Sequence, residues 1–274
     1  VGDFPAEEPR HEAHTGFSVG YVGTLSYAKL HPDFVRFCAR VKDICGVFFR
    51  LVGDAENEAR IRRDAAPFGL AEQLSFAGYV TDVTAELCRM DVFAYLLNPQ
   101  HFGTTENVLL EAMNAGLAVV ALDQCAEKHL VRDGETGLLV RTPEEFEQAL
   151  RRLYAHPEER ARLGRNARRY IEENFSVGRT AAHLNAVYDD IMKMEKTLCD
   201  FTGMGKDPHE VFLNFLPPPL REGFVQGSVP KELPEILLGE SKSSVRHFAR
   251  IFPEDEMLCG WAREIVQRKG GGAR

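Results

Sequence analysis

The segment "HFGTTENVLLEAMNAGLAVVALD", residues 101–123, contains the pattern that decides the fold. Within it, residues 107–116 predict a helix that ends at a glycine. Residues 117–123, "LAVVALD", then form an uninterrupted apolar run, which is typical of a strand buried on both faces. Because such strands belong to parallel sheets covered by helices, the segment predicts one helix and one strand of a βαβ unit.

The same alternation of strand-like and helical patterns extends from this segment in both directions. Six short apolar runs predict strands, at residues 17–23, 47–53, 74–80, 91–97, 117–123 and 136–140. Helical patterns separate these runs, and three more helices are predicted at residues 143–155, 157–175 and 177–198. Strands that alternate with helices form parallel sheets with right-handed crossovers. The sequence therefore predicts an α/β fold with a doubly wound, Rossmann-like, six-stranded parallel sheet, which binds ligands at the carboxyl ends of its strands.

The composition changes at both ends of this region. Residues 1–16 are polar and contain proline, and we interpret them as a linker remnant. Residues 17–198 form the predicted ligand-binding domain. Residues 199–274 form a C-terminal extension, proline-rich at first, which we predict to be extended and then helical. We expect the extended part to lie on a surface through three apolar side chains, Phe212, Phe215 and Leu216.

Charge and residue usage exclude several classes of function. The formal net charge of the 274 residues is -8, whereas nucleic acid binds to a basic face, so we predict no nucleic-acid partner. The six cysteines form no CxxC pair and the nine histidines form no HExxH, which predicts reduced thiols and no metal site. No apolar run reaches the roughly 18 to 20 residues that span a bilayer.

The nucleotide-binding and hydrolase motifs of α/β folds are absent from the sequence. It has no GxGxxG after its first strand, no GxxxxGK[ST] and no GxSxG. What remains is a loop of small residues, Gly103, Thr104 and Thr105, directly before a predicted helix. Backbone N–H groups in such a loop and the positive end of the helix dipole attract anions, so the loop predicts a pyrophosphate cradle.

Three charged side chains belong to segments that follow predicted strands. Lys29 follows the first strand, where its ammonium could meet a phosphate. The Glu111 carboxylate could accept hydrogen bonds from the two hydroxyls of a ribose. The alternative is structural, with Lys29 and Glu111 facing water and Glu106 complementing the helix dipole. The pattern alone leaves both interpretations open.

Several stretches, taken together and in order, resemble one known family. They are "VGYVGTLSYAK", "FRLVGDAE", "LSFAGYVTDV", "MDVFAYLLN", "FGTTENVLLEAMNAGLAVVALD" and "AEKHLVRDGETGLLV". On these, residues 17–194 resemble the C-terminal, nucleotide-sugar-binding domain of retaining GT-B glycosyltransferases of group 1, which build polysaccharides, glycolipids and cell-wall sugars. The last three stretches make the resemblance specific.

The resemblance implies roles for individual residues. Lys29 matches the lysine that contacts the donor diphosphate, and Thr24 stands where the family has an arginine. Glu111 matches the glutamate that binds the ribose hydroxyls. The segment of Gly78, Tyr79 and Val80 matches the one that reads the base. The loop of Gly103, Thr104 and Thr105 matches the phosphate cradle.

The family's first glutamate, eight residues before the ribose glutamate, has no direct match in this chain. That position is Gly103. An alignment on "QHFG" would place Gln100 there, and a rearranged loop would use Glu106 instead. We predict Glu106, so that Lys29 and Glu106 are the predicted catalytic residues.

The implied reaction transfers a hexosyl group, with retention, from a nucleoside diphosphate sugar of the UDP or GDP type. The acceptor is a hydroxyl on a sugar or lipid-linked molecule, and the resemblance implies no metal or other cofactor. Family members bind the acceptor through a preceding domain, whereas residues 1–16 are too few for one. We therefore expect a fragment that lacks the N-terminal acceptor domain and is inactive alone. We expect a cytoplasmic location, with a peripheral position at the inner face of the membrane as the alternative.

Two further expectations concern partners and rival functions. Residues 177–198 resemble the helix that packs on the N-terminal domain in family members, and its apolar face predicts a surface for a homodimer. The sequence also leaves open a noncatalytic module that binds a nucleotide sugar or a partner through residues 199–274. A sugar-nucleotide epimerase of the same architecture is the third alternative, although "TENVLLEAM" favours the transferase.

Overall fold

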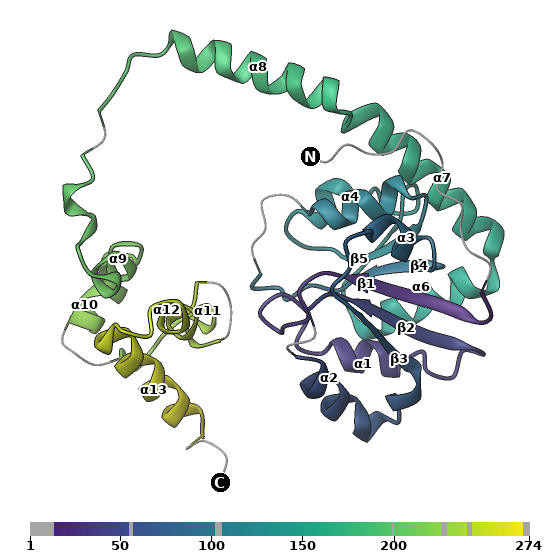
Figure 1. Cartoon of the computed structure of the whole chain (residues 1–274), viewed down its shortest axis with the longest axis horizontal. Coiled ribbons are helices and arrows are strands. Elements are labelled where there is room, and N and C mark those ends of the chain that lie inside the picture. Colours follow the sequence, from purple (N-terminus) through teal and green to yellow (C-terminus); the bar gives the residue numbers. More distant parts are fainter. Residues whose placement is uncertain are drawn as a thin grey trace. The chain divides into compact units, whose positions relative to one another are not determined.

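Six parallel strands form the sheet of the first part of the chain (Figure 1). The computed structural model describes residues 14–54, 57–101, 106–198, 200–225, 229–239 and 243–270. The strands are β1 (Phe17–Val22), β2 (Val47–Val52), β3 (Leu74–Gly78), β4 (Val92–Tyr95), β5 (Ala118–Leu122) and β6 (Leu138–Val140). They lie in the order β3-β2-β1-β4-β5-β6, and all neighbours are parallel. This order confirms the predicted doubly wound sheet, and each strand lies within its predicted range.

Helices cover both faces of this sheet. They are α1 (Phe34–Ala39), α2 (Glu58–Ala65), α3 (Val83–Leu87), α4 (Asn107–Asn114), α5 (Glu127–Leu130), α6 (Pro143–Ala155) and α7 (Pro157–Asn174), with short 3-10 turns at Ala66–Phe68 and Ala71–Gln73. Helix α8 (Val177–Lys193) follows α7 and covers neither face. Helix α1 contacts α2 and α6, whereas α4 contacts α3 and α7, and Figure 1 shows α1 and α2 on the opposite face from α3 and α4. Covered on both sides, β1 and β5 are buried along their whole length, as uninterrupted apolar runs require.

Helix α7 packs against the turn between α4 and β5 at a position where only glycine fits. A Cβ on Gly164 would lie 1.8 Å from the carbonyl oxygen of Gly116. Gly116 itself has a positive φ of 76° at the end of α4, a conformation that side chains disfavour. The glycine that ends the helix in the opening segment is therefore also a docking point for α7.

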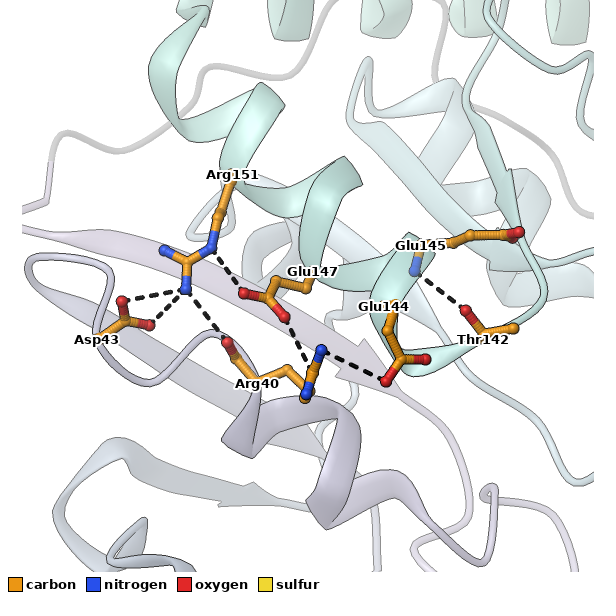
Figure 2. Close-up of polar contacts among 7 residues, drawn as sticks. All are labelled: Arg40, Asp43, Thr142, Glu144, Glu145, Glu147 and Arg151. Atoms are coloured by element: carbon orange, nitrogen blue, oxygen red, sulfur yellow. Dashed lines mark hydrogen bonds and ion pairs between the residues drawn. The ribbon is translucent and has the colours of Figure 1, made fainter.

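A surface network of ion pairs joins α6 to the end of α1 (Figure 2). The Arg151 guanidinium lies 2.8 Å from Asp43 and 3.0 Å from Glu147, and that of Arg40 lies 2.9 Å from Glu147. Thr142 is the N-cap of α6, because its hydroxyl accepts a hydrogen bond from the Glu145 N–H at 3.2 Å. Exposed pairs of this kind each stabilise a fold by less than about 1 kcal/mol, so the buried side chains of α6 hold it in place.

Helix α8 has no buried residue. Its exposed apolar side chains include Leu184, Val187, Tyr188 and Ile191, which recur at helical spacing. The predicted apolar face is thus present and uncovered, while the homodimer stays a prediction. No helix in the described part of the chain is long and apolar enough to cross a membrane.

The C-terminal part, Met194–Arg274, forms a separate compact unit of helices. Its elements are a 3-10 turn at Thr202–Met204 and helices α9 (Pro208–Asn214), α10 (Pro218–Val225), α11 (Glu235–Leu238), α12 (Val245–Ile251) and α13 (Glu256–Gly270). The prediction of an extended segment after residue 199 was wrong. Pro208 and Pro218 are the first residues of α9 and α10, positions where the missing proline N–H costs nothing. The prolines that suggested an extended chain therefore start helices.

Aromatic side chains form the core of this unit. Phe212, Phe224 and Trp261 are buried against one another, with ring centroids 4.9 Å apart for Phe224 and Trp261. Leu216 is also buried in this core, whereas Phe215 is 67% exposed. We expected Phe212 and Leu216 to lie on another surface, but both are buried in the core of this helical unit.

Polar side chains in this unit serve as helix caps. The buried Asp255 carboxylate accepts hydrogen bonds from the N–H of Leu258 at 3.0 Å and from the N–H of His209 at 2.9 Å. Asp207 and Glu210 form a capping box at the start of α9. Asp207, His209 and Glu210 lie close enough together to hold a metal ion, but the Glu210 carboxylate and His209 Nδ1 already have partners in these caps.

Candidate functional site

The loops after β1 and β4 meet at the carboxyl edge of the sheet. The Asn98 N–H donates to the Lys29 carbonyl at 2.7 Å, and the Asn98 side chain donates to the Tyr27 carbonyl at 2.8 Å. The His31 N–H donates to the Leu96 carbonyl at 2.9 Å. These bonds fix the backbone of Lys29 beside the end of β4, at the point where the strand order reverses and doubly wound folds bind ligands.

Glu106 lies at this same place, buried at the start of α4. Its side chain is 4% exposed, and the Tyr95 hydroxyl donates to its Oε2. Lys29 Nζ lies 3.8 Å from Oε2 and His101 Nε2 lies 3.8 Å from Oε1. The structure therefore brings the two predicted catalytic residues, Lys29 and Glu106, into contact. Glu106 occupies the N-cap position of α4 without capping it through its side chain.

A second buried carboxylate, which the sequence analysis missed, belongs to the same cluster. Glu127, 2% exposed, is the first residue of α5, after β5. Its Oε1 accepts a hydrogen bond from the Gln124 side chain at 3.2 Å. Burial raises the pKa of Glu127, and the nearby Glu106 charge adds to this, while its hydrogen bonds and the Lys29 ammonium lower the pKa. The Lys29 ammonium is thus paired with Glu106, and Glu127 is a second buried carboxylate near both charges.

Glu111, predicted to bind a ribose, is half-buried on α4, five residues after Glu106. Partial burial raises the pKa of its carboxyl group. Glu106 is the N-cap residue, with a non-helical ψ of 74°, whereas Glu111 lies inside the helix. The structure places Glu111 on the helix that starts at the cluster but does not bring it into the cluster.

Of the other predicted residues, Gly78, Tyr79 and Val80 belong to the end of β3 and the loop after it, two strands from β1, whereas Thr24 is on the same loop as Lys29. Gly78 ends β3 with a φ of 72°, and a Cβ there would meet no atom within 4 Å. Tyr79 is 83% exposed, and Val80 packs partly against the core. Thr24, on the loop after β1, is exposed, and its carbonyl accepts a hydrogen bond from the Tyr21 hydroxyl.

The predicted phosphate cradle, Gly103, Thr104 and Thr105, lies outside the described residues. Of the three alternatives for the first glutamate, Gln100 is half-buried and its N–H donates to the Asn98 side chain at 2.9 Å. Glu106 is the alternative that contacts Lys29.

Tyr95 and His101 are the other residues that sequence reasoning missed. Tyr95 lies in an apolar strand and resembles a core residue, and His101 lies in a loop. Both touch Glu106 only because β4, its following loop and the start of α4 converge at one point. A tyrosine at the carboxyl end of a strand, next to the switch point, was the one available signal.

The family comparison agrees with this geometry. The family described as "Glycosyl transferases group 1" matches residues 16–156. The chain belongs to the group 1 glycosyltransferases. The lipopolysaccharide core biosynthesis mannosyltransferase LpcC of Rhizobium leguminosarum is 31% identical over 135 residues, which cover 48% of this chain and 38% of LpcC. This group 1 chain therefore spans well under two thirds of that relative's length.

Solved structures show the same fold. Anabaena HepE in complex with UDP superposes with a TM-score of 0.57 at 23% identity, over 64% of this chain and 49% of HepE. The C-terminal domain of a group 1 family protein, LpcC of Francisella tularensis, superposes with a TM-score of 0.51 at 19% identity, over 59% of this chain and 87% of that domain. The sheet of this group 1 glycosyltransferase is thus that of a GT-B C-terminal domain.

Proposed function

We propose that residues 17–198 bind a nucleoside diphosphate sugar for retaining transfer of its hexosyl group to an acceptor hydroxyl. The observation that carries the proposal is the buried contact of Lys29 with Glu106 at the switch point of the sheet. Family membership and the UDP bound to the neighbour HepE support a nucleotide-sugar donor. The titrations below test which base and which sugar the donor carries.

In the proposed reaction, the bond between the anomeric carbon and the diphosphate oxygen breaks, and its electron pair stays on that oxygen. The Lys29 ammonium stabilises the charge that develops there. The acceptor oxygen forms a bond to the anomeric carbon on the face that the diphosphate leaves, and the proton of the acceptor hydroxyl passes to the departing diphosphate oxygen. Glu106 faces the sugar, and Glu111 accepts hydrogen bonds from the ribose hydroxyls.

Lys29 has to exchange partners in this scheme. Without donor, its Nζ lies 3.8 Å from the Glu106 carboxylate. A diphosphate carries more negative charge than one carboxylate and draws the ammonium toward itself, which leaves Glu106 free to accept a sugar hydroxyl. In this scheme, donor binding moves the Lys29 side chain and thereby exposes the lone pairs of Glu106.

The experiment titrates the chain with UDP, GDP and their sugar derivatives by calorimetry, for wild type and Lys29→Met. We expect wild type to bind one nucleotide series and Lys29→Met to bind it about 10- to 100-fold more weakly, because one charge-assisted hydrogen bond is lost. Lys42→Met is the matched control, since Lys42 is exposed and donates to the Phe68 carbonyl away from the cluster. A folded wild-type chain that binds no nucleotide of either series would contradict the proposal.

A further inference from the structure

Tyr95 touches both members of the proposed catalytic pair. It is fully buried on β4, and its hydroxyl donates to Glu106 Oε2. Lys29 Nζ lies 5.9 Å from the centroid of its ring, within the range of a cation–π contact. A single rigid side chain on a central strand thus contacts the carboxylate through its hydroxyl and the ammonium through its ring.

The ring of Tyr95 is itself held in place. It is stacked against Tyr21, with centroids 6.2 Å apart and planes at 22°, and against Phe93, at 5.5 Å and 24°. A buried hydroxyl requires a partner, and here that partner is the Glu106 carboxylate. Burial, and then the hydrogen bond to Glu106, raise the pKa of Tyr95 well above its usual value, so the phenol remains a donor at all ordinary pH values.

We propose that Tyr95 is the positioning residue of the donor site, which holds the Glu106 carboxylate toward the donor sugar. This inference rests on the proposed function. When a diphosphate draws Lys29 away, Glu106 loses its cation but keeps the hydroxyl of Tyr95. Tyr95 therefore acts on the part of the affinity that comes from the sugar, and much less on the part that comes from the nucleotide.

The substitution Tyr95→Phe removes the hydroxyl and leaves the ring that faces Lys29. We expect the ratio of the Kd for the nucleoside diphosphate to the Kd for its sugar derivative to fall about tenfold, because Glu106 loses one hydrogen bond to a charged group. The Kd for the nucleoside diphosphate should stay within about threefold. The probes are UDP with UDP-glucose and GDP with GDP-mannose, measured by calorimetry.

Tyr21→Phe is the matched control for the loss of a buried phenol hydroxyl. Tyr21 is as buried as Tyr95 and stacked on it, but its hydroxyl donates to the Thr24 carbonyl, at 3.2 Å. We expect this variant to leave the ratio unchanged. A merely structural role for Tyr95 would weaken binding of nucleotide and nucleotide sugar equally, and that result would overturn the inference.

A second measurement needs no ligand. Urea unfolding of wild type, Tyr95→Phe, Glu106→Gln and the double variant tests whether the two side chains act as a pair. We expect the shifts in midpoint to be non-additive, and in the Glu106→Gln background Tyr95→Phe should no longer change the affinity ratio. Additive midpoints overturn the positioning role. Failure of wild type to bind any of the four probes contradicts the proposed function instead, and the urea cycle still decides whether Tyr95 holds Glu106.

Discussion

The two units of this chain bury carboxylates in opposite ways. In the helical unit, Asp255 accepts hydrogen bonds from two backbone N–H groups and the His209 ring. Burial alone would raise the pKa of Asp255, but these bonds outweigh it and hold the pKa below its usual range. In the α/β unit, Glu127 is also buried, yet its pKa is raised, first by burial, and the charge of a second carboxylate, Glu106, raises it further.

This difference separates a structural carboxylate from a candidate functional one. Fixed backbone donors stabilise the ionised form of Asp255 permanently, so that its charge is part of the fold. The Glu106 carboxylate is instead paired with the Lys29 ammonium, a side chain that can move to a ligand, and both of these charges act on the pKa of the nearby Glu127. Buried groups whose pKa is shifted by burial and by like charge gather at functional sites.

The two units can be observed separately by their own fluorescence. All seven tyrosines of the sequence lie between residues 21 and 188, in the unit Val1–Lys193, and the single tryptophan, Trp261, lies in the unit Met194–Arg274. Unfolding followed by tyrosine or by tryptophan emission therefore reports on one unit at a time.

The largest expected effect is on the helical unit. Phe224→Ala removes a fully buried ring that packs on Trp261 and Phe212, and we expect it to lower the free energy of unfolding of this unit by about 3–5 kcal/mol. Trp261 emission in urea measures this, while the tyrosine transition should not move. Phe215→Ala, at an exposed site, is the control. Equal loss in both transitions would show that the two units unfold as one.

The corresponding change in the α/β unit is Gly164→Ala. The added Cβ would collide with the Gly116 carbonyl, and relieving the clash should cost about 1–3 kcal/mol in the tyrosine transition. Gly178→Ala, in the exposed helix α8 where a Cβ meets no atom within 4 Å, should be neutral or stabilising by up to about 1 kcal/mol. If both glycines tolerate alanine equally, α7 does not dock on the turn as closely as described.

A smaller effect is expected at Asp255. Asp255→Asn removes a buried charge that caps a helix, which should destabilise the helical unit by about 1–2 kcal/mol at pH 7. Because the pKa of Asp255 is lowered in the folded state, its contribution is present above the usual aspartate value, near 3.9, and disappears as the pH falls through the lower folded-state pKa. Tryptophan-detected unfolding of both proteins from pH 7 to pH 2.5 should therefore converge at the acid end. A difference that is independent of pH would mean that the charge is not involved.

The smallest effect, and of opposite sign, is expected at Glu127. A glutamate whose pKa is raised on folding contributes stability at low pH, which is lost as the pH rises through the folded-state pKa. Glu127→Gln should therefore leave the α/β unit at pH 7 as stable as wild type or slightly more stable, by less than about 1 kcal/mol. Tyrosine-detected urea midpoints at pH 5 and pH 8 measure this. A clear loss of stability at pH 8 would place Glu127 in the same structural class as Asp255.

The reliability of sequence reasoning also differed between the two units. Every strand of the α/β unit could be predicted, because a run such as "LAVVALD" is compatible with few environments other than a sheet buried on both faces. Right-handed crossovers predicted the doubly wound sheet, and six strands suited a Rossmann-like order. In the helical unit, the same rules failed at Pro208 and Pro218, because proline both breaks helices and begins them.

Only some residues of the buried cluster could be named from the sequence. Lys29 could be named because it follows a strand and matches a family lysine, whereas Glu106 was one of three alternatives for the family's first glutamate. The topology sends the segments after strands to one edge, where these two side chains meet. Glu127 could not, since it begins a four-residue helix in a segment with no distinctive spacing. Its burial depends on Gln124 and the end of β4, which lies next to β5 only in the folded sheet.

The sequence by itself determined the sheet of this protein, its family and which residues follow the strands, because periodicity and strand-end position are local properties of the chain. Only the tertiary structure decided that Glu106 is buried against Tyr95 and Lys29, and that Phe212 and Trp261 share a core. Contacts between residues distant in the chain depend on which elements pack together. Residues 101–123 show both contributions. Their helix and strand were predictable from the sequence, whereas the position of Glu106 at the start of that helix depends on its contact with Tyr95 on β4.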